Sequence, residues 1–272
     1  MNILQLPIVI DDFHYVPASI RTALSRTIKS LIPAIPVLLI AVNAEAFEAV
    51  RAEPDLNGRV WRLEIAEWSQ EELGEIAKAG FAALNVSDPG EGIGSLLAVE
   101  SHHSPFLMQQ LSLDFMTMEG ILQRQADTRI LARREAMDDF FYRIARRTMP
   151  PVFDDLLRGP GVRGTARVTR TLRNGLTPDI YGAVLYALAR IPNPGKAHVT
   201  DLRAILARDA VQAVSSQDIS NALHQMSRIA YERRGDSDPV LVFRREEVHI
   251  LDPILGFFLR RGRWEDEALT AQ

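Results

Sequence analysis

Residues 6–14 read LPIVIDDFH, a short apolar run that is closed by two acids, Asp11 and Asp12. A continuous apolar run of this length is typical of a strand buried on both faces, as in a parallel sheet. A second such run, residues 36–42 (PVLLIAV), follows an amphipathic helical segment over residues 19–31. The order strand, helix, strand predicts a parallel unit, because parallel neighbours need a crossover connection.

Downstream of this unit the pattern changes from strands to helices. Residues 59–65 (RVWRLEI) alternate between polar and apolar and predict a third strand. Ser69 and Glu72 then fit a capping box at the start of a helix. Apolar spacing predicts helical structure up to about residue 153, over 96–100, 106–115 and 125–144, with a loop at 88–94.

The C-terminal third has the element order of a winged helix. Helices are predicted over residues 178–190, 199–206 and 216–231, followed by a hairpin whose strands are 240–244 and 248–251. A short last helix is expected over 254–261, with a frayed tail after Gly262. The fold class is therefore expected to be α/β first and mainly α afterwards.

Composition restricts the class of protein. The chain has 272 residues, of which 47% are hydrophobic and 24% charged, as in ordinary globular proteins. The net charge of -4 gives no global basic field for nucleic acid, and the absence of cysteine excludes disulfides and cysteine-ligated zinc. We expect a cytoplasmic protein without a membrane partner, because the N-terminus lacks signal-peptide features and the apolar stretch 32–42 is too short to span a bilayer.

The motif at residues 6–14 resembles the Walker B motif of STAND and related AAA+ P-loop ATPases, in which four apolar strand residues precede two acids. The resemblance implies ATP and Mg²⁺ as cofactors, with Asp11 holding Mg²⁺ through water and Asp12 orienting the attacking water. Run 36–42 resembles the neighbouring sensor strand, with Asn43 at its tip. Arg59 matches the position of an arginine finger. Each of these residues also has an alternative without nucleotide. Asp11 and Asp12 would then form a solvated acidic turn, Asn43 would cap a helix, and Arg59 would be a surface residue.

Two further segments carry the same resemblance. Residues 101–111 resemble the small-residue–x–proline element of the helical lid, which implies that Ser104 and Pro105 lie near the nucleotide base. His103 stands where the family usually has glycine. Two adjacent histidines at a helix start do not face one ion, so His102 and His103 are not expected to bind metal. Residues 248–260 resemble the ending of ATPases with a C-terminal winged helix.

The implied domain organisation covers nearly the whole chain. A partial P-loop ATPase core is expected over 1–66 and a helical lid over 67–155, then a linker or loop over 156–176, a winged helix over 177–262 and a tail over 263–272. Polar residues on or after the candidate recognition helix predict a DNA contact through base edges or phosphates: Gln217, Asn221, Gln225, Arg228, Arg233 and Arg234. Nearby acids dilute this charge, so a protein-docking or autoinhibitory role stays open.

The sequence contains no G-x-x-x-x-G-K-[ST] loop to wrap the phosphates of a triphosphate. The resemblance places such a loop before the Walker B strand, so either an upstream part is lost or the protein works without it. We therefore expect an ATP-binding, nucleotide-dependent molecular switch that hydrolyses poorly or not at all as an isolated chain. The alternative is a non-enzymatic winged-helix module that binds DNA or docks a protein. Two further partners are possible, namely a second copy of this chain and a separate chain that carries the phosphate-binding loop.

Overall fold

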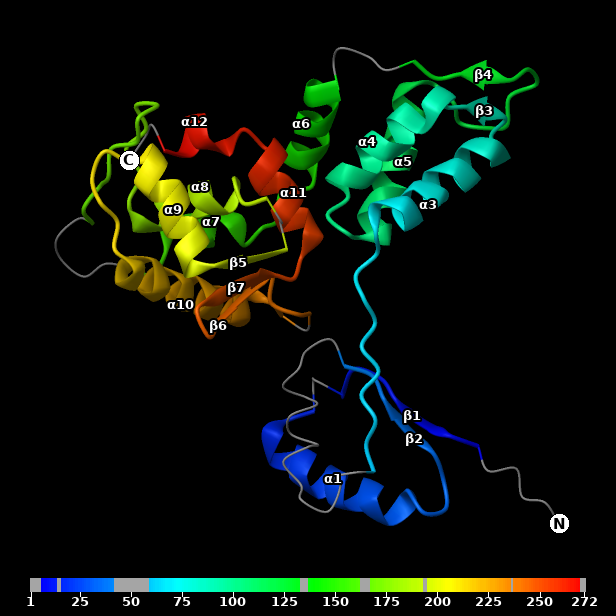
Figure 1. Ribbon diagram of the computed structural model, residues 1–272, viewed down its shortest axis with the longest axis vertical. Helices are drawn as coiled ribbons and strands as arrows, with labels where there is room; N and C mark the ends of the chain where they lie inside the picture. The colour runs from blue at the N-terminus through cyan, green and yellow to red at the C-terminus, as the bar shows by residue number, and fades with distance from the viewer. Residues whose placement is uncertain are drawn as a thin grey trace. The chain divides into compact units, whose positions relative to one another are not determined.

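The chain divides into two compact units, residues 1–66 and residues 67–272 (Figure 1). The computed structural model describes residues 6–13, 16–41, 59–132, 137–161, 167–192, 195–235 and 237–269. Within these ranges the fold is mixed α/β, with many helices and three small sheets. No helix in the described ranges is long and apolar enough to cross a membrane.

The first unit is built on a strand, helix, strand arrangement. Strand β1 (Ile8–Ile10) pairs in parallel with β2 (Val37–Leu39), and helix α1 (Ala18–Leu31) connects them. The register places Val9 opposite Leu38. This arrangement confirms the parallel unit predicted from the two apolar runs.

Phe13 is the centre of the small core of this unit. Its side chain is buried and packs against partly buried apolar residues of the strands, of α1 and of the adjoining turns, namely Ile10, Val16, Leu24, Ile32 and Leu39. Because strand side chains alternate, Ile10 and Leu39 point to this core, whereas Val9 and Leu38 point to the opposite face and are half exposed. The sheet is thus covered by the core on one face only, within the described residues.

The prediction of a third strand over residues 59–65 is wrong. These residues are not in a strand, and no described segment pairs with them. Alternation of polar and apolar residues favours an extended chain, but a strand also needs a neighbour that accepts its backbone hydrogen bonds. The side chains of Trp61, Leu63 and Ile65 are therefore largely exposed.

The second unit begins with the predicted capping box. The Glu72 backbone N–H donates to Ser69 Oγ (3.2 Å), and the Ser69 backbone N–H donates to Glu72 Oε2 (2.8 Å). The elements that follow are α3 (Gln70–Ala83), β3 (Val86–Ser87), the 3₁₀ turn η3 (Pro89–Glu91), α4 (Gly92–Glu100), α5 (Pro105–Met118), β4 (Arg129–Ile130) and α6 (Met137–Arg147). Helices α3, α4 and α5 pack together.

Ser69→Ala is expected to lower the free energy of unfolding of the 67–272 unit by about 1 kcal/mol, because one backbone donor of α3 loses its cap. Urea unfolding followed by the fluorescence of buried Trp264 measures this change. Ser69→Thr keeps a hydroxyl at the cap and should recover most of the loss. Equal stability of the alanine variant and the wild type would show that the box contributes nothing.

The predicted helix over residues 125–144 is only partly correct. Helix α6 begins at Met137, while residues 129–130 form β4, which pairs in parallel with β3. The backbone N–H groups of Gln125, Arg129 and Leu131 donate to the carbonyl groups of residues 84, 85 and 87. Pairing with a segment about forty residues upstream therefore replaces the helical hydrogen bonds that local spacing suggested.

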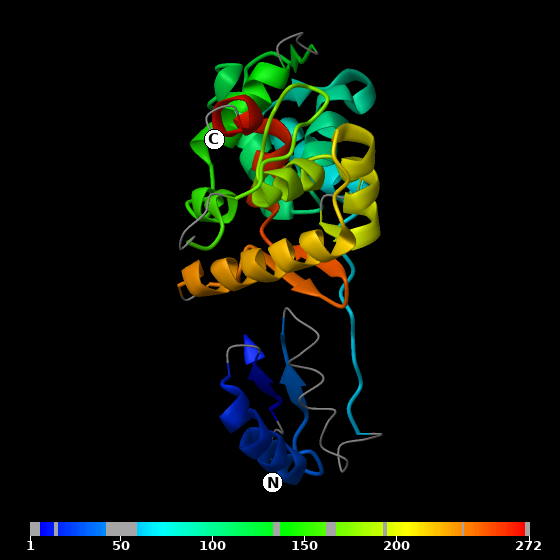
Figure 2. The ribbon, with the colours of Figure 1, turned by 90° about the vertical axis from the view of Figure 1, so that its left-hand side faces the viewer.

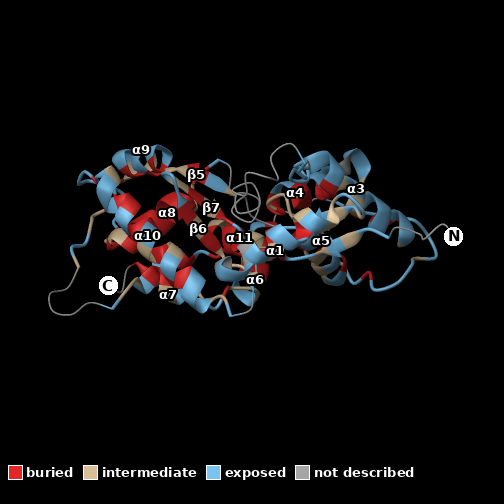
Figure 3. Cartoon of the chain, turned by 90° about the horizontal axis from the view of Figure 1, so that it is seen from below, coloured by how far each residue is buried: buried red, intermediate tan, exposed pale blue. Residues whose placement is uncertain are grey.

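The C-terminal half contains the predicted helices and hairpin in the predicted order, together with one short strand and two short helices that were not predicted. Its elements are α7 (Phe153–Arg158), α8 (Ile180–Leu188), β5 (Lys196–His198), α9 (Val199–Asp209), α10 (Ser216–Arg233), β6 (Leu241–Arg244), β7 (Glu247–Ile250), α11 (Pro253–Arg261) and α12 (Trp264–Ala268). All residues of α8 after Ile180 are buried, so this helix is the centre of the packing (Figure 3).

The three strands form an antiparallel sheet in the order β5, β7, β6. Sequence reasoning missed β5, because its three residues, two of them polar or charged, carry no apolar run. Helix α10 packs on α8, α9 and β6 through Ile219, Leu223 and Met226. The sheet and α8 thus hold α10 with one face outward (Figure 2).

Two predicted connecting segments are more ordered than expected. In the segment 156–176, Leu156 is fully buried at the end of α7, and Leu172 is buried and forms a bridge with Ala210. In the tail, residues 264–268 form α12, and the buried Trp264 indole N–H donates to the Leu259 carbonyl (3.0 Å). Apolar contact with the core thus holds these described parts of the two segments, which local composition did not reveal.

Aromatic rings and one arginine join the helices of the second unit. Phe257 of α11 lies edge-on to Phe141 of α6, with ring centroids 6.2 Å apart. Arg261 of α11 donates through Nε to Glu100 Oε2 of α4 (2.7 Å) and through Nη1 to Asp138 Oδ1 of α6 (2.9 Å). Glu100 is buried, so the ion pair fixes the α11 end against α4 and α6.

Candidate functional site

The two acids of the Walker B-like motif lie at the carboxyl end of β1. The Phe13 backbone N–H donates to the Ile40 carbonyl, and the Ile40 N–H donates to the Ile10 carbonyl, both at 2.9 Å. These bonds keep the chain beside β2 after the strand ends. Asp11 and Asp12 are therefore held at the sheet edge where the carboxyl ends of both parallel strands meet.

Both carboxylates are exposed, and the turn has an unusual backbone. Asp12 adopts φ of 53°, and its N–H donates to Asp11 Oδ1 (2.8 Å). Aspartate tolerates this left-handed region better than most residues, because its short side chain bonds locally. Exposed carboxylate oxygens are ligands that a hydrated Mg²⁺ prefers, so the donor set fits an ion bound through water.

The other predicted residues of this site are placed only in part. Asn43 lies outside the described residues, and β2 precedes it with Ile40 and Ala41 as the last described positions. Arg59 lies in an exposed turn. Their proximity to Asp11 and Asp12 stays a prediction.

Ser104 and Pro105 form the start of helix α5 in the second unit. Ser104 is the N-cap, its Oγ accepting from the Leu107 N–H (3.2 Å), and Pro105 occupies the first helical turn. Proline suits this position because the first N–H groups of a helix have no internal partner. The small-residue–x–proline pattern thus has a structural role as a helix start. A contact of this pair with a nucleotide base stays a prediction.

His102 and His103, which precede Ser104, lie in different surroundings. Both adopt left-handed backbone angles, with φ of 49° at His102 and 61° at His103. The ring nitrogens of His102 are buried without a hydrogen-bond partner, and its ring lies edge-on to Phe257. Burial, with Arg260, His103 and Arg261 nearby, lowers the pKa of His102 to about 3. His103 Nδ1 instead lies 2.8 Å from the Trp68 carbonyl oxygen.

An ion held through water by Asp11 differs from a metal site built from several protein side chains, and the described residues contain no site of the second kind. No cluster of three or more described histidine, aspartate and glutamate side chains could hold an ion.

Helix α10 presents a polar stripe to solvent. Its exposed members recur at positions i, i+4, i+7, i+11 and i+14, which lie on one helix face. We call this set the α10 stripe, and it comprises Gln217, Asn221, His224, Arg228 and Tyr231. Gln217 Nε2 donates to Asn221 Oδ1 (2.9 Å), and Arg228 Nε lies 3.7 Å from Glu232 Oε1.

The stripe differs in membership from the predicted DNA-binding set. Gln225 is half-buried, and its Oε1 is buried without a partner. Arg233 Nε pairs with Asp155 Oδ2 of α7 (2.9 Å), and the Arg234 guanidinium lies over the Tyr231 ring (3.6 Å). Gln225 and Arg233 therefore lie off the stripe, and Arg234, the C-cap of α10, contacts its last member. His224 and Tyr231, which sequence reasoning missed, lie on the stripe. Helical spacing from Gln217 could have identified both.

The β6–β7 hairpin lies beside α10 and carries two exposed arginines, Arg244 at the end of β6 and Arg245 in the turn. Arg245 and Glu246 have φ of 48° and 63°, as in the two-residue turns that close hairpins. Ser220 Oγ of α10 donates to Glu246 Oε2 (2.8 Å), which ties the turn to the helix. The stripe and the turn thus belong to one rigid scaffold.

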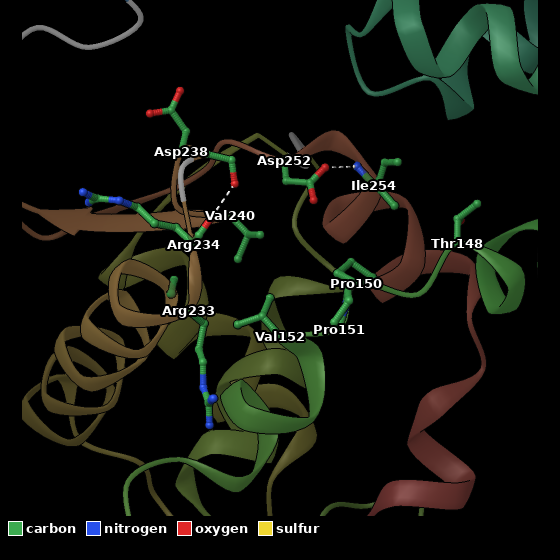
Figure 4. Close-up of a pocket in the computed structure, with 12 residues that line it drawn as sticks. Thr148, Pro150, Pro151, Val152, Arg233, Arg234, Asp238, Val240, Asp252 and Ile254 are labelled. Carbon is green, nitrogen blue, oxygen red and sulfur yellow. Dashed lines mark hydrogen bonds between the residues drawn. The ribbon is translucent and has the colours of Figure 1, made fainter. Parts of the chain in front are cut away.

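A hollow of about 340 Å³ lies where the C-terminal end of α10 meets the starts of α7 and α11 (Figure 4). Pro150, Pro151, Val152, Val240 and Ile254 give it an apolar lining. Asp252 Oδ1 accepts from the Ile254 N–H (2.8 Å) as the N-cap of α11, and burial raises its pKa. The guanidinium groups of Arg233 and Arg234 point away from the hollow, so no set of polar groups converges there.

Comparison with known proteins gives distant structural likenesses only. No protein-family profile and no curated protein matches the chain. Two single-substitution variants of RuvB from Thermotoga maritima cover 91% of this chain and 76% of their own, with 13% and 12% identity and TM-scores of 0.38 and 0.35. Cdc6p from Pyrobaculum aerophilum covers 96% of this chain and 66% of its own, with 10% identity and a TM-score of 0.34.

Scores this low carry no argument about family or function. The function is therefore argued from the residues of this chain.

Proposed function

We propose that the chain is part of an ATPase of the STAND/AAA+ kind and acts as a nucleotide-dependent molecular switch. The observation that supports this most is the parallel β1–β2 pair with Asp11 and Asp12 directly after β1. In open parallel sheets, ligands bind beyond the carboxyl ends of the strands. A nucleotide triphosphate with Mg²⁺ is the ligand for which two adjacent carboxylates at that edge are suited.

Each residue has an assigned role in this proposal. Asp11 would hold Mg²⁺ through a water molecule, and Asp12 would orient the attacking water. Asn43 and Arg59 contact the phosphates. Bound Mg²⁺ would neutralise phosphate charge. Because the 272 residues contain no G-x-x-x-x-G-K-[ST] loop, binding is weak and hydrolysis deficient.

Thermal unfolding with ATP and Mg²⁺ tests this function. At a ligand concentration about five times the dissociation constant, a bound nucleotide stabilises the folded unit by about 1 kcal/mol. The increase should require Mg²⁺ and should fall in Asp11→Asn, whereas Asp12→Asn should retain it, because Asp12 acts on the water. Stabilisation by ATP that is identical with Mg²⁺ and with a chelator would remove Asp11 from the site.

A second candidate function, binding of duplex DNA, is favoured by the α10 stripe. We propose that the helix–strand–helix–helix–hairpin module is a winged helix, with α10 as the recognition helix and Arg244 and Arg245 on the wing. Glutamine and asparagine pair with adenine, and arginine with guanine, through the base edges of the major groove. A major groove admits one α-helix, and the stripe is the outward face of one. Protein docking through the same face is the alternative.

Arg228→Ala is expected to weaken duplex binding about tenfold, because an arginine contact with a base or phosphate contributes about 1–3 kcal/mol. Fluorescence anisotropy with a labelled duplex at several salt concentrations measures the effect. Arg143→Ala, which changes an exposed arginine of α6, is the matched control and should bind as the wild type does. Wild-type protein that fails to bind at low salt would favour the protein-docking role instead.

A further inference from the structure

The hollow beside the C-terminal end of α10 is walled mainly by apolar side chains. Its volume of about 340 Å³ lies within the range of about 300–1,000 Å³ that is usual for small-ligand pockets. Pro150, Pro151 and Val152 line it just before α7, while Val240 and Ile254 line it at the starts of β6 and α11 (Figure 4). None of the lining residues is assigned to nucleotide binding or belongs to the α10 stripe. The hollow is therefore a separate feature of the second unit, with walls that suit the hydrocarbon part of a ligand.

The second carboxylate oxygen of Asp252 points toward this apolar space (Figure 4). The Asp252 backbone N–H donates to the Val240 carbonyl (3.2 Å), and Asp252 Oδ1 accepts from the Ile254 N–H (2.8 Å), so the side chain is held in one position. Among the described residues, no side chain donates to the second oxygen. Burial raises the pKa of Asp252, as expected for a carboxylate that has lost water without gaining a counter-ion.

The net charge that faces the hollow from its lining residues is negative. The other charged side chains of the lining, those of Arg233, Arg234 and Asp238, point away from it (Figure 4). Arg233 is held outside by its ion pair with Asp155. The start of α11 contributes a partial positive charge of about +0.5, which is smaller than the full charge of Asp252. The hollow thus offers a cation one fixed carboxylate oxygen beside an apolar wall.

We propose that the hollow binds an aliphatic primary ammonium group, with its hydrocarbon chain against the apolar wall and its nitrogen on the second oxygen of Asp252. A charge-assisted hydrogen bond to a carboxylate is stronger in a partly dry site than in water. A guanidinium group fits less well, because it binds a carboxylate through both oxygens and the Ile254 N–H already occupies one of them. The ammonium group is carried either by a free aliphatic amine or by a lysine side chain, which have the same chemistry.

Titration of the full-length, methyl-labelled protein with n-hexylamine at neutral pH, followed by NMR, tests the site. The methyl signals of Val152, Val240 and Ile254 should move together with a dissociation constant of about 1 mM, while those of the exposed Leu122 stay in place. n-Hexanol, which lacks the charge, and ethylamine, which lacks the long chain, should each bind at least about tenfold more weakly. Unmoved signals at the three lining residues, or equal binding of n-hexanol, overturn the proposal.

Asp252→Asn tests the carboxylate without removing the helix cap. Asparagine caps helices as well as aspartate does, so stability should change little, whereas the affinity for n-hexylamine should fall at least about tenfold. Asp88→Asn is the matched control, because Asp88 also accepts from backbone N–H groups at a helix start and its replacement removes the same charge. The control should bind n-hexylamine as the wild type does. Unchanged affinity in Asp252→Asn, or an equal loss in both variants, would refute the site.

A blocked lysine, N-acetyl-lysine amide, distinguishes the two sources of the ammonium group. If it displaces n-hexylamine at a similar concentration, the hollow accepts a lysine side chain of a partner. If n-hexylamine binds and the blocked lysine does not, the ligand is a free aliphatic amine. Failure of both compounds to bind overturns the proposal.

Discussion

Replacing Glu100 with glutamine is expected to lower the free energy of unfolding of the 67–272 unit by about 3 kcal/mol, because it leaves the Arg261 guanidinium without its buried counter-ion. The Glu100 side chain is only 3% exposed, and the interaction with Glu100 raises the pKa of Arg261. This loss of unfolding free energy is at the low end of the range for breaking a buried ion pair, because Arg261 keeps its contact with Asp138. Urea unfolding monitored by Trp264 fluorescence measures the change.

Two variants show whether this loss comes from an unpaired charge. Asp139→Asn removes the partner of Arg263, but that pair is exposed, so the change should be about 0.5 kcal/mol or less. Adding Arg261→Met to Glu100→Gln removes both charges and should recover much of the stability, because an apolar side chain of similar size can replace a buried pair. A double variant no more stable than Glu100→Gln would mean that packing, and not charge, is responsible.

Acid should destabilise the second unit through His102. Its folded pKa of about 3 lies below the ordinary value of 6.5, so the unfolded chain binds a proton that the folded chain does not. Stability is therefore present above pH 6.5 and is lost as the pH falls from 6.5 towards 3. At pH 5 the loss from this one group is about 2 kcal/mol relative to pH 8.

His102→Asn should remove about 2 kcal/mol of the difference in unfolding free energy between pH 8 and pH 5. Asparagine tolerates the left-handed backbone at this position, which makes it the least disruptive replacement. His103→Asn is the matched control, because it alters a neighbouring histidine with similar backbone angles that contacts the Trp68 carbonyl group. A pH dependence that persists in the His102 variant would assign the acid sensitivity to other groups.

The elements that could be predicted are those whose signal is local. Strands β1 and β2 are short apolar runs, and the Ser69–Glu72 capping box is a four-residue pattern. Residues 59–65 and 129–130 could not be predicted, because strand formation depends on a neighbour distant in sequence. Alternation at 59–65 indicated a strand that has no described partner, and the pairing of β4 with β3 replaced an expected helix.

The residues of the candidate sites also divide into those with a local sequence signal and those that depend on distant neighbours. The position of Asp11 and Asp12 at the end of β1 could be predicted, because a buried run determines where its strand ends. The outward face of α10 could not be fully identified, because it depends on which side packs against α8 and β6. Gln225 is therefore half-buried, and Arg233 is paired with Asp155, a residue far away in the sequence.

Hydrogen exchange with mass spectrometry, with and without ATP and Mg²⁺, tests the central claim most directly, because it locates the nucleotide on the chain. The account predicts slower exchange in peptides covering residues 6–13 and 36–41 only when ATP and Mg²⁺ are both present, and loss of that protection in Asp11→Asn. Unchanged exchange in these peptides at a nucleotide concentration that stabilises the protein, or protection confined to the 67–272 unit, would contradict the claim that the nucleotide binds at the carboxyl end of β1.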